Sequence, residues 1–163
     1  MNNSFEFKTI DLNMINHWES IQLYNKIKTK NQDKQEFVFM DGPPFVSSSN
    51  LHLGHMLISS IKSIILNYKN MIGYKVTNRI GYDCHGIPIE QACNKDLNIS
   101  TKDEVINKIS IFNYNKNCKR LVQEYSGAWD DIFRRIGRFV DFKDYYKTLD
   151  LEFMESVWWV FSK

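Results

Sequence analysis

The chain has 163 residues, of which 43% are hydrophobic and 14% aromatic, so it can fold around a core of its own. A formal net charge of +2 is too small to indicate a nucleic-acid surface from charge alone. The three cysteines form no Cys-x-x-Cys pair, which argues against a zinc knuckle or a disulfide framework and fits a reducing compartment. The polar start and the lack of a membrane-length apolar run predict a soluble, cytoplasmic protein that does not enter a membrane.

Residues 1–35 are predicted to form a helical N-terminal extension. Asp11 can cap a helix, and the apolar residues behind it have helical spacing: Leu12, Ile15, Trp18, Ile21 and Tyr24. The polar and mostly basic segment 26–35 is interpreted as a solvated helix end and linker, and a nucleic-acid contact is the alternative.

The next segment predicts a strand, a loop and a helix. The apolar run 37–40 is typical of a buried strand, which Asp41-Gly42-Pro43-Pro44 ends because proline cannot donate to a sheet ladder. After the polar loop 46–50, apolar residues recur every three or four positions, which predicts an amphipathic helix. Its apolar face would contain Leu53, Leu57, Ile61, Ile64, Ile65 and Tyr68.

The first turn of this predicted helix contains His52-Leu53-Gly54-His55. Free backbone N–H groups and a partial positive charge at a helix N-terminus attract phosphate. Gly54 lets a ligand approach the backbone, and the imidazoles of His52 and His55 can donate hydrogen bonds to phosphate oxygens. A metal site or two solvated histidines are the alternatives. With its surroundings, the pattern predicts a nucleotide site.

A second strand is predicted over residues 74–80, after Gly73 ends the helix in a left-handed conformation. A right-handed crossover would place this strand parallel to the first one. Ligands of open parallel sheets bind beyond the carboxyl ends of the strands. We therefore expect the loops 43–55 and 81–90 to meet at one edge of the sheet and to frame one pocket.

The second half of the chain is predicted to be mainly helical. Thr101 and Glu104 form a capping-box pattern, and a longer helix follows, which Gly137 ends. The buried stripe of this helix is predicted to contain Cys118, Leu121, Val122, Tyr125, Trp129, Ile132, Phe133 and Ile136. The neighbouring arginines are interpreted as a solvated face, with a nucleic-acid contact as the alternative: Arg134, Arg135 and Arg138.

Asp150 can cap a last helix, which carries on one side Met154, Val157, Trp158 and Phe161. This helix reaches residue 163 without a glycine, a proline or a polar tail, so a truncation is expected. The order helix, strand, helix, strand and helices predicts that residues 36–163 form the first half of a doubly wound α/β domain.

Several motifs together resemble the class I aminoacyl-tRNA synthetases, and among them the isoleucyl-tRNA synthetases of the eukaryotic cytosolic type. They are Pro43-Pro44-Phe45, His52-Leu53-Gly54-His55 and the loop 81–90, which reads GYDCHGIPIE. The similarity continues through residues 146–149 and 153–161 and begins near Trp18. It implies the N-terminal half of a Rossmann-like catalytic domain with a parallel, doubly wound sheet.

The resemblance implies that ATP with Mg²⁺ activates isoleucine to isoleucyl-adenylate and that the aminoacyl group then passes to tRNA(Ile). His52, Gly54 and His55 would bind ATP, and the two histidines would be catalytic. The isoleucine would be bound by Pro43, Pro44, Phe45, Asp83 and His85. Asp83 would pair with the α-amino group, whereas its alternative role is that of a turn residue. Glu90 matches the last residue of its motif, and its role stays open.

Three departures from the family pattern matter. The loop 46–51 lacks the usual glycine and is one residue longer, and Tyr82 replaces a tryptophan. The second ATP signature, Lys-Met-Ser-Lys-Ser, the editing insertion and the anticodon-binding domain are not in the sequence. The resemblance therefore implies half of an adenylate site, with the remainder of the synthetase as a partner. The alternatives are a small nucleotidyltransferase with His-x-Gly-His, or a remnant that binds ATP, another ligand or a partner without turnover.

Overall fold

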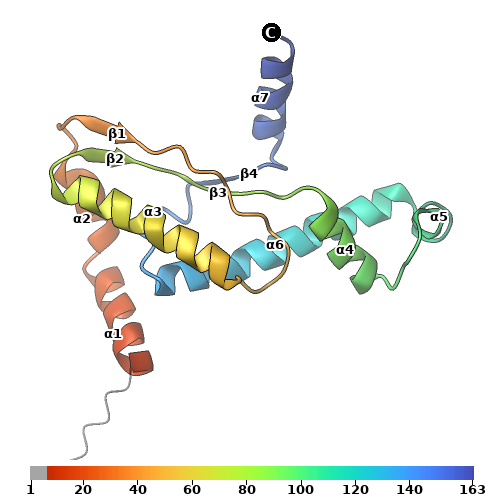
Figure 1. Cartoon of the computed structure of the whole chain (residues 1–163), viewed down its shortest axis with the longest axis horizontal. Helices are drawn as coiled ribbons and strands as arrows, with labels where there is room; N and C mark the ends of the chain where they lie inside the picture. The colour runs from red at the N-terminus through yellow and green to blue at the C-terminus, as the bar shows by residue number, and fades with distance from the viewer. Residues whose placement is uncertain (1–6) are drawn as a thin grey trace, which may run out of the picture.

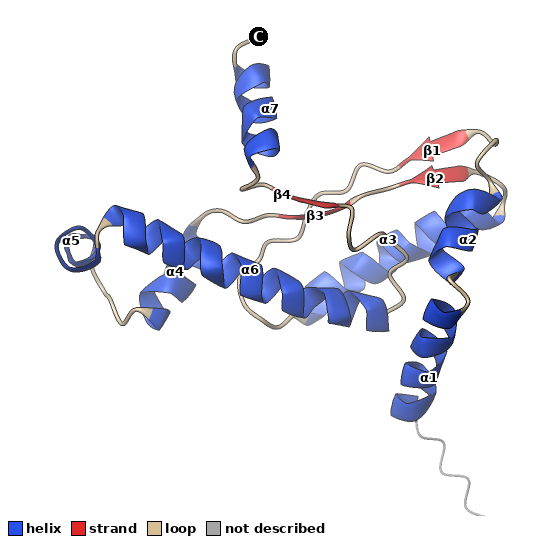
Figure 2. Cartoon of the chain, turned by 180° about the vertical axis from the view of Figure 1, so that it is seen from behind, coloured by secondary structure: helices blue, strands red, loops and turns tan. Residues whose placement is uncertain are grey.

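Residues 7–163 are described by the computed structural model, and the polar start of the chain, residues 1–6, lies outside the described residues. Figure 1 shows the elements in chain order, and Figure 2 shows them from behind. They are α1 (Phe7–Ser20), α2 (Leu23–Lys30), β1 (Glu36–Val38), α3 (Leu53–Met71), β2 (Lys75–Thr77), β3 (Ile80–Tyr82), α4 (Ile87–Asp96), α5 (Lys102–Glu104), the π-helical turn η1 (Val105–Ile109), α6 (Ile111–Arg135), β4 (Tyr145–Lys147) and α7 (Leu151–Phe161).

The strands pair in parallel, which confirms the prediction of a parallel α/β arrangement. Strand β1 pairs with β2 in a register that aligns Phe37 with Val76, and β3 pairs with β4 in a register that aligns Gly81 with Tyr146. The strands are shorter than predicted, and the prediction of a buried strand over residues 37–40 is wrong, since Val38 is 57% exposed and Met40 is 88% exposed. The strand expected over residues 74–80 is split into β2 and β3, and β4 was not predicted at all.

The core lies between the carboxyl half of the strands and the helices α4 and α6. Helix α6 runs beneath β3 and β4 for much of the length of the molecule (Figures 1 and 2). Half of its predicted buried stripe is buried, namely Leu121, Val122, Trp129 and Phe133. The other predicted residues are only partly buried: Cys118, Tyr125, Ile132 and Ile136. The rest of the core cluster comes from the strands, their loops and α4: Val46, Ile80, Tyr82, Cys84, Ile89, Cys93 and Val140.

Helix α3 forms where predicted, but it does not bury its apolar stripe. We call the α3 apolar face the set of predicted stripe residues, whose exposed fractions lie between 40% and 83%: Leu53, Leu57, Ile61, Ile64, Ile65 and Tyr68. The buried residues lie on the other side: Ser59, Ser63, Leu66 and Asn70. The stripe is exposed because polar contacts hold that other side against the rest of the chain. Arg138 donates to the Ser59 carbonyl at 3.3 Å, and Asn31 donates to the Asn70 carbonyl at 2.7 Å.

The N-terminal helices differ in detail from the prediction. Helix α1 begins at Phe7, so Asp11 lies inside the helix and does not cap it. Its carboxylate instead accepts a hydrogen bond of 2.7 Å from Arg135. A left-handed Gln22, with φ of 51°, separates α1 from α2. The predicted apolar side does contact the body of the protein, since the Trp18 ring lies 5.3 Å from that of Phe139.

The predicted solvated face of three arginines is wrong at Arg138. This side chain is buried, and its guanidinium binds the carboxylate of Asp41 at 2.7 Å. Arg134 and Arg135 are partly exposed, as expected, but each faces a carboxylate of α1. A cation that follows a helix end is easily interpreted as solvated, because its acidic partner lies far away in the sequence.

The capping box at Thr101 is confirmed, since its hydroxyl accepts from the Glu104 N–H at 3.3 Å and the Glu104 carboxylate accepts from the Thr101 N–H at 3.2 Å. The long helix expected behind it is interrupted at Ser110, where φ is 76°. Gly73 and Gly137 end α3 and α6 with φ of 97° and 75°, as predicted.

Asp150 is the N-cap residue of α7, but its carboxylate accepts from the Lys147 N–H at 2.7 Å and caps no helical N–H. The apolar residues near the end of α7 are between 53% and 82% exposed: Val157, Trp158, Trp159, Val160 and Phe161. In the part of the chain that the structure describes, no helix is long and apolar enough to cross a membrane.

Candidate functional site

The two predicted loops lie side by side at the carboxyl edge of the strands. Phe45 and Asp83 form a parallel bridge. The Asp83 N–H donates to the Pro44 carbonyl at 2.9 Å, and the Val46 N–H donates to the Asp83 carbonyl at 2.9 Å. This pairing extends the parallel ladder beyond β1 and β3. It confirms that the loops 43–55 and 81–90 meet at one edge.

The first turn of α3 is capped by the first histidine of the motif. Nδ1 of His52 accepts the His55 N–H at 3.2 Å, so a neutral His52 has its proton on Nε2, which remains a donor. The His52 ring folds over Gly54, where an added Cβ would lie 3.0 Å from it. The absence of a side chain at Gly54 thus makes room for the His52 ring that caps the helix. Since the cap occupies one of the expected free N–H groups, those of Leu53 and Gly54 remain for a ligand.

The surroundings of the His55 ring disfavour its charged form. Burial, and secondarily the nearby His52, lower the pKa of His55. The two imidazoles stack with 3.6 Å between their centroids. Among the described residues, Nδ1 of His55 is buried without a hydrogen-bond partner. The site therefore begins with two stacked imidazoles, of which the inner one resists protonation.

Trp129 of α6 supports this end of the site from below. It is fully buried, and its ring lies 5.1 Å from that of His55. Its Nε1–H donates to the Ser48 carbonyl at 2.9 Å, and the Ser48 hydroxyl donates to the Asn50 carbonyl at 2.8 Å. The serine-rich loop, which departs from the family pattern, is thus tied to the core. From the sequence, Trp129 was interpreted as a core residue alone, and a buried indole N–H that needs an acceptor was the available signal.

A cavity of about 150 Å³ lies beneath the proline pair and is lined by Pro43, Pro44 and His55. Its charged wall consists of Asp41 with Lys62 and Arg138. Burial lowers the pKa of Arg138, and the Asp41 carboxylate opposes this shift. Asp41 was interpreted only as part of the strand end. A carboxylate directly after a predicted apolar strand was the signal for this network, which sequence reasoning missed.

The Asp83–His85 turn is held by the end of β4. Asp83 Oδ1 accepts the His85 N–H at 3.4 Å, while Oδ2 makes no hydrogen bond to any described residue. The Thr148 hydroxyl oxygen accepts the Cys84 N–H at 2.9 Å and lies 3.1 Å from Nδ1 of His85. Asp83 therefore forms the turn with one oxygen and can bind a cation with the other.

Tyr82, which replaces the usual tryptophan, belongs to the core. Its side chain is buried, its hydroxyl donates to the Asp130 carboxylate, and burial raises the pKa of the phenol. Its ring centroid lies 6.5 Å from that of Trp129. The departure from the family pattern therefore lies in the core that supports the site.

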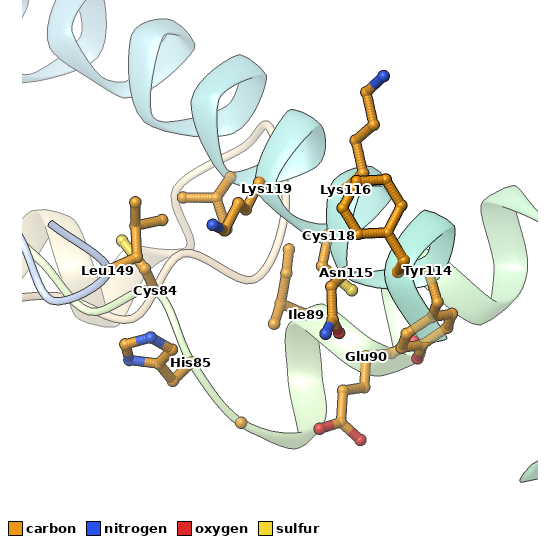
Figure 3. A pocket seen from close by; sticks show the side chains of 13 residues that line it. Cys84, His85, Ile89, Glu90, Tyr114, Asn115, Lys116, Cys118, Lys119 and Leu149 are labelled. Carbon is orange, nitrogen blue, oxygen red and sulfur yellow. The ribbon is translucent and has the colours of Figure 1, made fainter. Parts of the chain in front are cut away.

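His85 faces a second cavity, of about 590 Å³, between α4 and α6 (Figure 3). In this view, His85 and Lys119 lie at one end of the cavity, and Tyr114 and Glu90 lie at the other. The expectation that the site residues of the two loops frame one pocket is wrong. Pro43, Pro44 and His55 line one cavity, His85 lines another, and Asp83 lines neither of the two. No cluster of three His, Cys, Asp or Glu side chains that could hold a metal is found among the described residues.

The strands are parallel, and the N-terminus of a helix, of the kind that can bind a nucleotide, lies at their carboxyl edge. These two features define an α/β protein with a Rossmann-like fold. Residues 13–163 match the family model "tRNA synthetases class I (I, L, M and V)", and the chain belongs to this family. This confirms the resemblance that the motifs indicated.

The related proteins are isoleucine–tRNA ligases. The chain is 42% identical over 159 residues to the cytoplasmic enzyme of Arabidopsis thaliana, covering 98% of this chain and 13% of that protein. It is 40% identical to the cytoplasmic enzyme of Saccharomyces cerevisiae and to the enzyme of Chlamydia pneumoniae, each over 15% of the relative's length. The chain thus spans about one seventh of these relatives. Because these relatives are isoleucine–tRNA ligases, the alternative that the chain is a small nucleotidyltransferase is not favoured.

One solved structure supports the fold. This chain aligns with a chain in the crystal structure of the ternary complex of Agrobacterium radiobacter K84 agnB2 LeuRS, tRNA and LeuAMS, with a TM-score of 0.70 and 14% sequence identity. The alignment covers 97% of this chain and 17% of that one. At this identity, the similarity confirms the fold class and nothing further.

Proposed function

We propose that this chain provides the part of a cytoplasmic isoleucine–tRNA ligase that binds ATP with Mg²⁺ and isoleucine. The observation that supports it best is the bridge between Phe45 and Asp83, because it joins the proline motif to the amino-acid motif. The start of α3, with His52, Gly54 and His55, follows from the same loop.

ATP is assigned to the start of α3. The N–H groups of Leu53 and Gly54 and Nε2–H of His52 are donors that suit phosphate oxygens, and the helix dipole favours their negative charge. The His55 ring stacks on the His52 ring and holds it in place. Mg²⁺ would enter with the phosphates. His52 and His55 would stabilise charge as pyrophosphate leaves, which is their proposed catalytic role.

Isoleucine is assigned to the bridge. Oδ2 of Asp83 would accept the ammonium group, and Pro43, Pro44 and Phe45 would contact the isoleucine side chain, with His85 contributing from the same loop as Asp83. The isoleucine carboxylate oxygen then attacks the α-phosphorus, the bond to the leaving pyrophosphate breaks, and isoleucyl-adenylate forms. Transfer to tRNA(Ile) would follow, with the remainder of the synthetase supplying the second ATP signature.

Calorimetric titration of the purified chain tests both assignments. We expect Asp83→Asn to weaken isoleucine binding by roughly 10- to 150-fold, since a hydrogen bond to a charged group contributes about 1.5–3 kcal/mol, and to leave ATP binding unchanged. The variant His52→Ala/His55→Ala should show the opposite pattern. Equal losses for both ligands in both variants, or no binding of either ligand to the wild type, would contradict the proposal.

Turnover is expected to require more than this chain. Removing one preorganised charge-stabilising group lowers the rate of comparable reactions by about 10²–10³, and the second ATP signature contributes several such groups. Isoleucine-dependent ATP–pyrophosphate exchange by the chain alone should therefore remain at the level of His52→Ala/His55→Ala. Exchange above that control would show that half of the site is sufficient.

A further inference from the structure

The cavity of about 150 Å³ beneath the proline pair is lined by charged groups that the proposed function does not use. We call it the Arg138 cavity, after the most deeply buried of these groups. Its charged lining consists of Asp41, Lys62 and Arg138, whose side chains are 5%, 18% and 3% exposed. Apolar side chains from three elements complete the wall: Ile58, Ile80 and Phe133. The charges thus lie in an interior space, where solvent screens them weakly.

The charges around the Arg138 cavity do not balance. The Asp41 carboxylate is shared by two cations, because Oδ1 binds Lys62 and Oδ2 binds Arg138. Among the described residues that line the cavity, Asp41 is the only carboxylate. An arginine keeps its proton in proteins, so one positive charge of the three groups has no counter-charge. A buried charge without a partner of opposite sign is strongly unfavourable.

The Arg138 guanidinium also has a donor to spare. Its Nη1 donates to the Ser59 carbonyl at 3.3 Å, and its Nη2 donates to the Asp41 carboxylate at 2.7 Å. Its Nε is buried and has no hydrogen-bond partner among the described residues. Since nearly all buried polar groups in proteins are hydrogen-bonded, an orphaned N–H on a deeply buried cation indicates a bound species.

Two further donors belong to residues that line the same cavity. The Lys62 ammonium donates to Asp41 and, at 3.0 Å, to the Gly42 carbonyl, which leaves one of its three N–H groups. Nδ1 of His55 is buried without a partner among the described residues, and a neutral imidazole can carry its proton on this atom. The cavity therefore combines an excess positive charge with several unused donors.

The size of the cavity limits the species that it can hold. At about 150 Å³, it is smaller than the sites of typical small-molecule ligands, which begin at about 300 Å³. Water fits and would satisfy the donors, but it would leave the excess charge in place. We propose that the Arg138 cavity binds a small monovalent inorganic anion, such as a halide, between Arg138, Lys62 and His55. This site goes beyond the proposed function, because its occupancy requires neither isoleucine nor ATP.

Urea denaturation of the purified 163-residue chain tests the proposal, with chloride exchanged for the much larger gluconate at constant ionic strength. A ligand that binds only the folded chain multiplies the folding equilibrium constant by one plus the ratio of ligand concentration to dissociation constant. The equilibrium constant should therefore be constant at low chloride and then approach an about tenfold rise for each tenfold increase in chloride. No dependence on chloride would show that water alone fills the cavity and would overturn the proposal.

Lys62→Met assigns the effect to this cavity. The substitution leaves Asp41 and Arg138 as a balanced pair, so the dependence on chloride should disappear. The matched control is Lys69→Met, the same substitution on the same helix, at a lysine that lies over the Phe37 and Tyr74 rings and does not line the cavity. It should keep the dependence of the wild type. A dependence retained by Lys62→Met, or lost equally in Lys69→Met, would overturn the proposal.

Bromide locates the ion without any variant. In crystals of the wild-type chain soaked in bromide, anomalous scattering should show a peak inside the cavity, within contact of Arg138 Nε and Lys62 Nζ. Peaks confined to the protein surface would overturn the proposal. Loss of the cavity peak on addition of isoleucine would also overturn it, since the cavity would then be part of the amino-acid site. A peak that persists with isoleucine supports a separate anion site, whether or not the proposed function holds.

Discussion

Helices α3 and α6 have apolar stripes of the same kind of spacing, but they use them in opposite ways. Helix α6 buries Leu121, Val122, Trp129 and Phe133 beneath the strands, whereas the α3 apolar face is 40–83% exposed. Periodicity predicts that a helix forms and which side is apolar. It does not predict which side contacts the rest of the described chain.

The buried side of α3 is mostly polar, and a network of charges holds it against the rest of the described chain. Asp41, which follows β1, binds Lys62 of α3 and Arg138, which follows α6 in the chain. Arg138 also donates a hydrogen bond to the Ser59 carbonyl of α3. This network fixes α3 beside Pro43 and Pro44, so the first turn of the helix faces the proposed isoleucine wall. Helix α6 is thus positioned by apolar burial and α3 by buried charge, and the following predictions test this difference.

The largest effect is expected for Asp41→Asn, which leaves the buried Arg138 and the mostly buried Lys62 without their carboxylate. Removal of one partner from a buried ion pair costs about 3–5 kcal/mol, and chemical denaturation should show a loss of that size. The control is Glu36→Gln, because the ion pair of Glu36 with Lys75 is exposed on both sides and should change stability by less than about 1 kcal/mol. Similar small losses for both variants would mean that charge does not position α3.

The two sides of α3 should respond differently to truncation. Leu66 is 5% exposed and Ile64 is 67% exposed. Leu66→Ala should destabilise the chain by about 2–5 kcal/mol, the range for a buried leucine. Ile64→Ala should change the free energy of unfolding by no more than about 0.5 kcal/mol, as exposed positions do. Thermal and chemical denaturation measure both values, and a larger loss for Ile64→Ala would show that the apolar face is covered in solution.

Close packing beneath the amino-acid loop predicts a smaller loss for Gly81→Ala. A Cβ at this position would lie 2.2 Å from the Tyr146 ring, which itself stacks on Phe153. Overpacking of this kind costs about 1–3 kcal/mol. Gly42→Ala is the control, because no heavy atom lies within 4 Å of its added Cβ. If both glycines tolerate alanine equally in denaturation experiments, β3 and β4 do not pack as described.

The smallest effect is a pH dependence due to His55. Because its pKa is lowered from 6.5 in the folded chain, the unfolded chain binds the proton more readily. The stability due to this group is complete above about pH 6.5 and decreases as the pH falls toward the lowered value. Denaturation curves between about pH 7.5 and about pH 5 should show this decrease, and His55→Gln should lack it. Equal pH slopes for both proteins would remove His55 as the cause.

Local signals in the sequence predicted much of the fold, and distant contacts account for what they missed. Gly73, Gly137 and the Thr101 capping box act within a few residues, so their predictions are confirmed. The bond between Asp41 and Arg138 joins residues 97 positions apart, and that between Trp129 and Ser48 joins residues 81 positions apart.

The juxtaposition of the two loops was predictable, because the parallel-sheet rule acts on whole strands and does not depend on individual side chains. The capping by His52 and the position of His85 on a separate cavity depend on side-chain rotamers, which no sequence pattern specifies. The assignment of ligands to these residues remains a prediction.

The central claim is that the proline motif and the amino-acid motif form one isoleucine site across the bridge between Phe45 and Asp83. Titration of the isotopically labelled chain with isoleucine, followed by amide NMR, tests this claim most directly. We predict that the amide signals of Phe45 and Asp83 shift together with one dissociation constant, and that Asp83→Asn weakens both responses equally. Shifts confined to one loop, two different dissociation constants, or no shift in either loop would contradict it.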